Sequence, residues 1–116
     1  MRYISTRGNA PAINFEEVVL TGLAPDGGLY VPETYPTLSQ EQIAGFAGKS
    51  YSQVAFEVMR PFVGDCISET KFKELIDASY ATFNQAAVVP LKQLESNHFL
   101  LELFHGPTLA FKDVAL

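Results

Sequence analysis

The residue best suited to chemistry by type and setting is Lys112, which follows the string His-Gly-Pro-Thr-Leu-Ala-Phe and precedes Asp113. The Gly-Pro pair predicts a sharp turn, and Thr108 can cap a helix that starts behind it. The helix macrodipole disfavours an ammonium group in the first turns, and a neutral lysine amine is a Schiff-base nucleophile. On spacing alone, the alternative of a solvent-facing lysine paired with Asp113 is favoured, because surface lysines are common.

Three other polar residues each have two interpretations. Asp113 either orients Lys112 or only favours the helix N-terminus electrostatically, and the second is preferred. His105 either contacts a ligand or serves as a structural hydrogen bonder beside the turn, which is the commoner role. Arg7, in a Ser-Thr-Arg-Gly loop, either binds a substrate phosphate in a longer enzyme or forms a surface or interdomain salt bridge. Residue type and spacing leave both roles open for each.

Two further features are considered as sites and set aside. Cys66 is either a nucleophile or a small apolar residue at a helix boundary, and the second is favoured because no reactive setting is evident. Asp26-Gly27-Gly28 could be mistaken for a phosphate loop, but no helix opens behind it, so it is predicted to be a turn. We expect no metal site.

The first elements that must position these residues are short. A strand is predicted over Tyr3–Ser5, and a second one over Leu29–Val31, where Pro32 ends it. Between them, Asn14–Glu17 has the spacing of a capping box, which predicts a short helix. Gly22 closes that helix, because glycine readily adopts the left-handed conformation found at helix ends.

Capping-box spacing recurs at Ser39–Gln42 and at Ser50–Gln53. The first predicts a helix that stops at Gly48, and the second predicts a helix that runs to Pro61. The clearest helix begins at Ser68, because its apolar residues recur at intervals of three and four. The face of the first helix is formed by Ile43, Phe46 and Ala47. The face of the last is formed by Phe72, Leu75, Ile76, Ser79, Tyr80 and Phe83, and is interpreted as core rather than as a ligand groove.

The character of the chain changes after Asn84. An apolar strand is predicted over His98–Phe104, and its near-continuous hydrophobicity is typical of burial on both faces, as at the start of an α/β sheet. A helix from Leu109 onward has no stop signal, and one or two strands do not make a domain. We therefore expect a fragment of a longer polypeptide.

Composition excludes several classes of protein. The 116 residues carry a net charge of −5 with only eight Lys and Arg, which argues against nucleic acid or an anionic membrane as the partner. The sequence has no apolar run long enough to be a signal peptide or a membrane span. A single cysteine permits no internal disulfide, which favours a reducing, cytoplasmic setting.

The ordered motifs together resemble the threonine synthase family of pyridoxal-phosphate enzymes. The segments that carry the resemblance are Tyr3–Gly8, Gly22–Pro32, Glu102–Phe104 and His105–Asp113. They cover essentially the whole chain, so chance agreement is implausible. The resemblance implies that Lys112 forms the Schiff base with pyridoxal 5'-phosphate and is both the catalytic and the cofactor-binding residue of this chain.

The family resemblance also implies a reaction and an architecture. The reaction converts O-phospho-L-homoserine and water to L-threonine and phosphate. The parent is expected to be an α/β enzyme, whereas this chain is expected to be α+β. Residues 1–84 would form the family's N-terminal domain and residues 85–116 the truncated start of the cofactor domain. The glycine-rich loop for the cofactor phosphate would lie beyond Leu116, so the chain alone is predicted to be inactive.

Two alternatives to the threonine synthase reaction remain open. The first is another fold-type II pyridoxal-phosphate lyase, which should lack the long helical N-terminal module. The second is a non-catalytic docking or regulatory module with Lys112 as an ordinary surface residue. For the chain alone, the segment from Ala86 is expected to be poorly ordered or to pair with another copy of the chain, so self-association is a further expectation.

Overall fold

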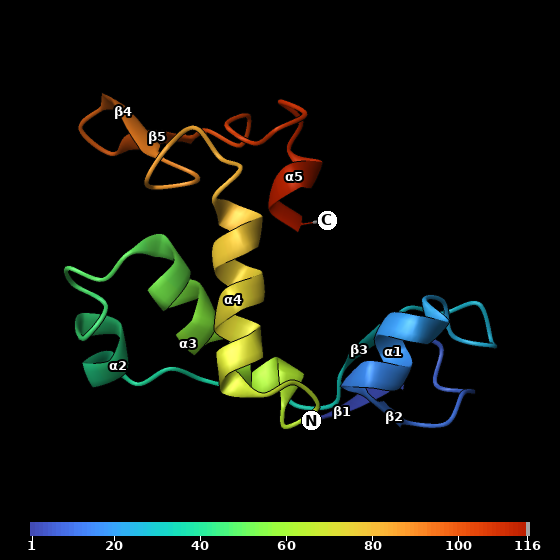
Figure 1. Ribbon diagram of the computed structural model, residues 1–116. Coiled ribbons are helices and arrows are strands. Elements are labelled where there is room, and N and C mark those ends of the chain that lie inside the picture. Colours follow the sequence, from blue (N-terminus) through green and yellow to red (C-terminus); the bar gives the residue numbers. More distant parts are fainter. Residues whose placement is uncertain (116) are drawn as a thin grey trace. The chain divides into compact units, whose positions relative to one another are not determined.

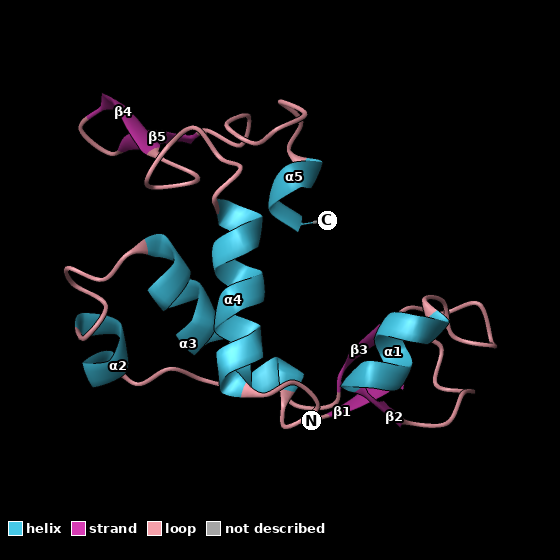
Figure 2. Ribbon diagram, viewed as in Figure 1, coloured by secondary structure: helices cyan, strands magenta, loops and turns pink. Residues whose placement is uncertain are grey.

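The computed structural model describes residues 1–115 as an α+β chain that divides into two compact units. One unit consists of Met1–Ala47 and Glu57–Glu69, and the other of Gly48–Phe56 and Thr70–Leu116. Figure 1 shows the order of the elements along the chain, and Figure 2 shows how much of it is loop. The expected α+β class of this chain is confirmed.

A small antiparallel sheet organises the first unit. Strand β1 (Arg2–Ser5) lies between β2 (Ile13–Asn14) and β3 (Tyr30–Pro32), with Ile4 opposite Val31. Burial alternates along β1, because successive side chains of a strand point to opposite faces. Both predicted strands form, but β3 is shifted by one residue, because Leu29 lies outside it and Pro32 closes it inside the sheet. It does so on an edge strand, where proline is tolerated.

Helix α1 (Phe15–Thr21) follows β2 directly and lies against the sheet (Figure 1). The Asn14 side chain accepts the backbone N–H of Glu17, and the Glu17 carboxylate accepts the N–H of Asn14, so the predicted capping box is confirmed. Gly22 ends the helix at φ 72°, as expected. Tyr3 anchors the other side of β1, where its hydroxyl donates to the carbonyl of Phe62 at 2.7 Å.

The two middle helices start where predicted but end elsewhere. Both capping boxes form, at Ser39 and at Ser50. Helix α2 (Gln40–Ala44) stops four residues before Gly48, and Ile43 is 55% exposed, so the predicted buried face of this helix was wrong. Helix α3 (Tyr51–Val63) continues past Pro61 into its last turn. A proline there removes one hydrogen bond near the helix end, which is less disruptive than at its centre.

Helix α4 (Glu69–Tyr80) contributes two residues to the core of the second unit. Phe72 and Ile76 are its buried residues, and the Phe72 ring lies 5.7 Å from that of Phe56 on α3. The predicted core stripe is confirmed at these two positions. It was wrong at Leu75, which is 44% exposed.

The predicted apolar strand is shorter and more exposed than expected. Strands β4 (Leu91–Glu95) and β5 (His98–Leu101) form an antiparallel pair, and every residue of both is exposed. The prediction of burial on both faces is therefore wrong for this chain. In the described part of the chain, this sheet has two strands only. Helix α5 (Lys112–Ala115) ends the described residues, and none of the described helices has the length and apolar character needed to cross a membrane.

Candidate functional site

Lys112 is the first residue of α5, and its side chain is exposed. A ten-residue loop joins it to β5, so its position depends on how residues 102–111 are held rather than on a sheet (Figure 2). The helix starts three residues later than the sequence suggested. Thr108 therefore lies too far upstream to be its N-cap, and the predicted capping role was wrong.

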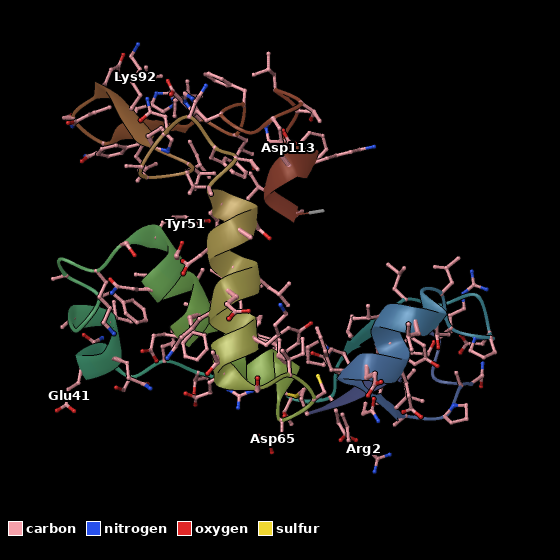
Figure 3. All side chains as sticks on the ribbon, viewed as in Figure 1. Arg2, Glu41, Tyr51, Asp65, Lys92 and Asp113 are labelled. Carbon is pink, nitrogen blue, oxygen red and sulfur yellow. The ribbon has the colours of Figure 1, made fainter. Side chains whose placement is uncertain are left out.

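A turn and a side-chain clasp hold the loop immediately before Lys112. Gly106 to Leu109 form a turn closed by a hydrogen bond from the Leu109 N–H to the Gly106 carbonyl at 3.2 Å. The Asp113 carboxylate reaches back from α5 and accepts two bonds from Thr108, one from its N–H at 2.9 Å and one from its hydroxyl at 2.6 Å. Figure 3 labels Asp113 on this helix. The contact that the structure gives Asp113 is this clasp with Thr108, which the sequence did not predict.

The loop also contains a strained residue. Leu109 has a φ of 62°, in the left-handed region that a residue with a Cβ rarely occupies. That conformation costs roughly 1–2 kcal/mol for an L-residue. Such a conformation persists only when its surroundings enforce it.

A second set of hydrogen bonds ties the start of the loop to the segment after α4. The His105 ring lies 3.0 Å from the Asn84 amide oxygen through Nδ1 and 2.7 Å from the Glu102 carboxylate through Nε2. The backbone N–H of Asn84 donates to the His105 carbonyl at 3.1 Å. His105 is thus a structural hydrogen bonder, the preferred interpretation from the sequence.

Arg7 belongs to the first unit, where its guanidinium donates to the backbone carbonyl of Asp26 at 3.1 Å. The Asp26 carboxylate in turn accepts hydrogen bonds from the Ser5 hydroxyl at 2.7 Å and from the N–H groups of Asn9 and Gly28 at 2.9 Å. The Gly28 and Ser5 bonds, with smaller contributions from Asn9 and the Arg7 charge, lower the pKa of Asp26. The turn that the sequence predicted here is confirmed, and Arg7 braces it.

Cys66 lies just after α3, and its thiol donates to the Val63 carbonyl at 3.2 Å. The side chain is exposed. Its place at a helix boundary agrees with the preferred interpretation. Among residues 1–115, no cluster of three or more His, Cys, Asp or Glu side chains is placed to hold a metal ion.

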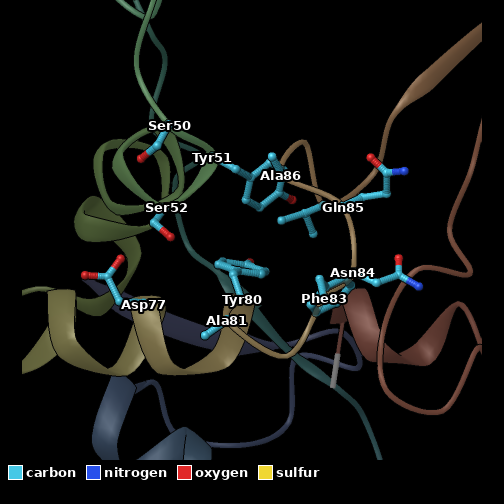
Figure 4. A pocket seen from close by; sticks show the side chains of 11 residues that line it. Ser50, Tyr51, Ser52, Asp77, Tyr80, Ala81, Phe83, Asn84, Gln85 and Ala86 are labelled. Carbon is cyan, nitrogen blue, oxygen red and sulfur yellow. The ribbon is translucent and has the colours of Figure 1, made fainter.

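The second unit contains an open cavity of about 340 Å³ between the start of α3 and the end of α4. Figure 4 shows Tyr51 and Tyr80 facing each other there, with ring centroids 4.8 Å apart. Burial, and then the neighbouring Tyr51, raise the pKa of Tyr80. Lys112 does not line this cavity, nor does it line two further hollows beside α1. The candidate site consists of the exposed start of α5 and the loop before it.

Comparisons with known proteins agree along the whole chain. A family model described as the threonine synthase N terminus matches residues 2–80. The chain is 59% identical over 116 residues to a threonine synthase of Pseudomonas aeruginosa, covering 100% of this chain and 25% of that protein. It is 49% identical over 115 residues to a threonine synthase of Schizosaccharomyces pombe, covering 98% of this chain and 22% of that protein.

A solved structure gives the same result. The pyridoxal-phosphate-bound threonine synthase from Brucella melitensis superposes with a TM-score of 0.95 at 53% identity, over 99% of this chain and 25% of that one. The chain thus spans about a quarter of the length of the curated relatives it matches.

Proposed function

The chain belongs to the threonine synthase family, and we propose that it is the N-terminal quarter of an enzyme that makes L-threonine and phosphate from O-phospho-L-homoserine and water. The observation that carries this proposal is the 59% identity to the Pseudomonas aeruginosa threonine synthase, which extends over every residue of the chain. The agreement of fold with the Brucella melitensis enzyme supports it independently of any single motif.

We propose that Lys112 is the residue of this chain that binds pyridoxal phosphate covalently. The residues present fit that group, because an exposed primary amine at a helix start is accessible to an aldehyde. The loop before it is also tightly built. A Cβ added to Gly106 would lie 2.4 Å from the Cβ of Asp113, so only glycine fits there.

Lys112 then has two tasks in the proposed reaction. Its amine would hold the cofactor and, once freed from it, would move protons at the substrate's α and β carbons. The cofactor, when bound, supplies the electron sink for this chemistry. The loss of phosphate and the addition of water at the β carbon both depend on those proton transfers.

The division of the parent follows from the same assignment. We propose that residues 1–84 form its N-terminal domain, supported by the family model that matches residues 2–80. Residues 85–116 would begin an α/β cofactor domain, in which further strands would pair with β4 and β5 and helices would cover their exposed faces. The substrate would be a small molecule, with neither nucleic acid nor membrane as partner, and the enzyme cytoplasmic.

We propose that the chain alone self-associates through this exposed sheet. Leu91, Phe99 and Leu101 are 48–66% exposed on β4 and β5, and both strands offer a free edge in the described residues. Sedimentation at rising concentration measures this directly. A chain that remains monomeric at every concentration contradicts the proposal.

The proposed function is tested with the full-length parent polypeptide. The wild-type enzyme should release phosphate from O-phosphohomoserine, whereas Lys112→Ala should lose nearly all of that activity. Lys71→Ala is the matched control, because Lys71 lies on α4 in the proposed N-terminal domain, its side chain is 61% exposed, and its loss should leave the rate unchanged. Full phosphate release by the Lys112→Ala enzyme would refute the assignment.

A further inference from the structure

Residues 108–113 form a closed ring. The two hydrogen bonds between Thr108 and Asp113 join its ends, and Lys112 lies within it, next to Asp113. The backbone at Lys112 is therefore restricted from both directions, by α5 on one side and by the turn that holds Thr108 on the other. Opening the clasp would allow the backbone at Lys112 to move.

Gly106 is the third part of this clasp. The glycine is buried, and a Cβ placed on it would meet the Asp113 carboxylate at 2.5 Å. Asp113 therefore packs against the backbone of the turn as well as bonding to Thr108. A larger residue at position 106 would push the carboxylate away.

The strain at Leu109 shows that the ring is held closed against a cost. Its positive φ lies between the two ends of the clasp, where a relaxed leucine would open the turn. The interactions that oppose this opening include the 3.2 Å turn hydrogen bond, the bond from the Asp113 N–H to the Ala110 carbonyl at 3.1 Å, and the two bonds from Thr108 to Asp113.

We propose that Thr108 and Asp113 are positioning residues for Lys112. Their clasp fixes the direction in which the Lys112 amine leaves the backbone, and so aligns it with the cofactor carbonyl and later with the substrate carbons. This inference rests on the proposed function, because it assumes that Lys112 carries the cofactor. It assigns to Asp113 a mechanical role instead of an electrostatic one at the helix start.

The test uses the full-length protein in four forms. Thr108→Val keeps the shape of threonine but removes the hydroxyl donor, Thr108→Ser keeps that donor, and Asp113→Asn keeps one acceptor for the Thr108 N–H. Thr82→Val is the matched control, because its hydroxyl also donates a 2.9 Å hydrogen bond, to the carbonyl of Ser79 at the end of α4.

Three quantities are measured for each form. The first is hydrogen exchange at the Thr108 amide, which we expect to accelerate about threefold to tenfold in Thr108→Val, the range for one lost hydrogen bond. The second is the rate at which added pyridoxal phosphate attaches to Lys112 in the apoprotein, followed by absorbance. The third is the division between kcat and KM in steady-state phosphate release.

The clasp predicts a specific pattern. Attachment rate and kcat should both fall by about tenfold or more in Thr108→Val, because small misplacements of a reacting group are costly, while KM changes by less than about twofold. Thr108→Ser should stay within about twofold of wild type, and so should Thr82→Val. Asp113→Asn, which retains part of the clasp, should be intermediate.

Two results would overturn the inference in distinguishable ways. Hydrogen exchange at the amide of residue 108 could accelerate in Thr108→Val while the attachment rate and kcat stay at wild-type values. The clasp would then open without affecting Lys112, which refutes the positioning role but leaves the proposed function intact. If the wild-type protein attaches the cofactor to a different lysine, the proposed site fails and the inference fails with it. Should Thr108→Val not fold, the folded Asp113→Asn protein decides the question by the same two criteria.

Discussion

Replacing Gly28 by alanine tests how the first unit is held together. Gly28 is buried in the turn that follows Asp26, and a Cβ built on it would lie 2.2 Å from the Ser5 hydroxyl oxygen and 3.0 Å from an Asp26 carboxylate oxygen. Neither atom can move freely. Ser5 is fixed in β1, and its hydroxyl is already bonded to Asp26 at 2.7 Å. The alanine must therefore displace β1 from the turn.

The size of the effect follows from that overlap. Inserting a methylene into a well-packed site costs about 1–3 kcal/mol, and an approach of 2.2 Å places this substitution at the upper end. For a domain of this size, each kcal/mol lowers the melting temperature by about 4–8 °C. Hydrogen exchange at the Thr6 amide is the local assay, because that N–H donates to the Leu29 carbonyl across the junction.

Gly45→Ala is the matched control for this substitution. Gly45 has φ −67°, an ordinary helical value, and its added Cβ would approach no atom closer than 3.3 Å. We expect Gly45→Ala to change the free energy of unfolding by less than about 0.5 kcal/mol. The reasoning is refuted if Gly28→Ala and Gly45→Ala show the same exchange rate at Thr6.

Two further predictions concern the stability of the separate units. The lowered pKa of Asp26 means that its stabilisation is present above the ordinary value of 3.8 and is lost as the pH falls through the lower folded-state value. Acid titration followed by circular dichroism should show this loss in wild type but not in Asp26→Asn, and parallel curves would contradict it. Phe72→Ala should destabilise the second unit by about 3–5 kcal/mol in denaturant melts, because Phe72 is 5% exposed. Phe111→Ala, at 65% exposure, should cost less than about 0.5 kcal/mol, and equal losses would show that Phe72 is not core.

Local signals in the sequence predicted where helices α1 to α4 begin, but not where α5 begins. The capping boxes at Asn14, Ser39 and Ser50 all form, because each depends only on two side chains and the backbone three residues away. Helix ends were harder to predict. Helix α2 stops at Ala44 although the sequence continues with apolar residues, and α3 tolerates Pro61 because only its last turn follows.

Burial could not be predicted from hydrophobicity alone. The apolar run around Phe99 predicts a strand buried on both faces, yet β5 is exposed because the described residues provide no layer to cover it. Burial depends on partners that are distant in sequence or outside the chain. A hydrophobic pattern shows only that such a partner is needed.

The sequence predicted which residues form the candidate site but not the hydrogen bonds that join Thr108 and Asp113. Lys112 and the Gly-Pro turn were visible as a motif, and His105 was correctly expected to be structural. The reach of Asp113 back to Thr108 was missed, because the two lie five positions apart and the contact depends on the turn at Gly106. The signal from which this contact could have been proposed is an acidic residue five positions after the threonine of a Gly-Pro-Thr turn.

The most direct test of the account is to trap the cofactor on the full-length protein. Borohydride reduction in the presence of pyridoxal phosphate should leave a stable label, which peptide mass spectrometry locates. The account predicts the label on Lys112, in the peptide that contains Thr108 and Asp113, and no label there in Lys112→Ala. A label on any other lysine, with Lys112 unmodified, would contradict it.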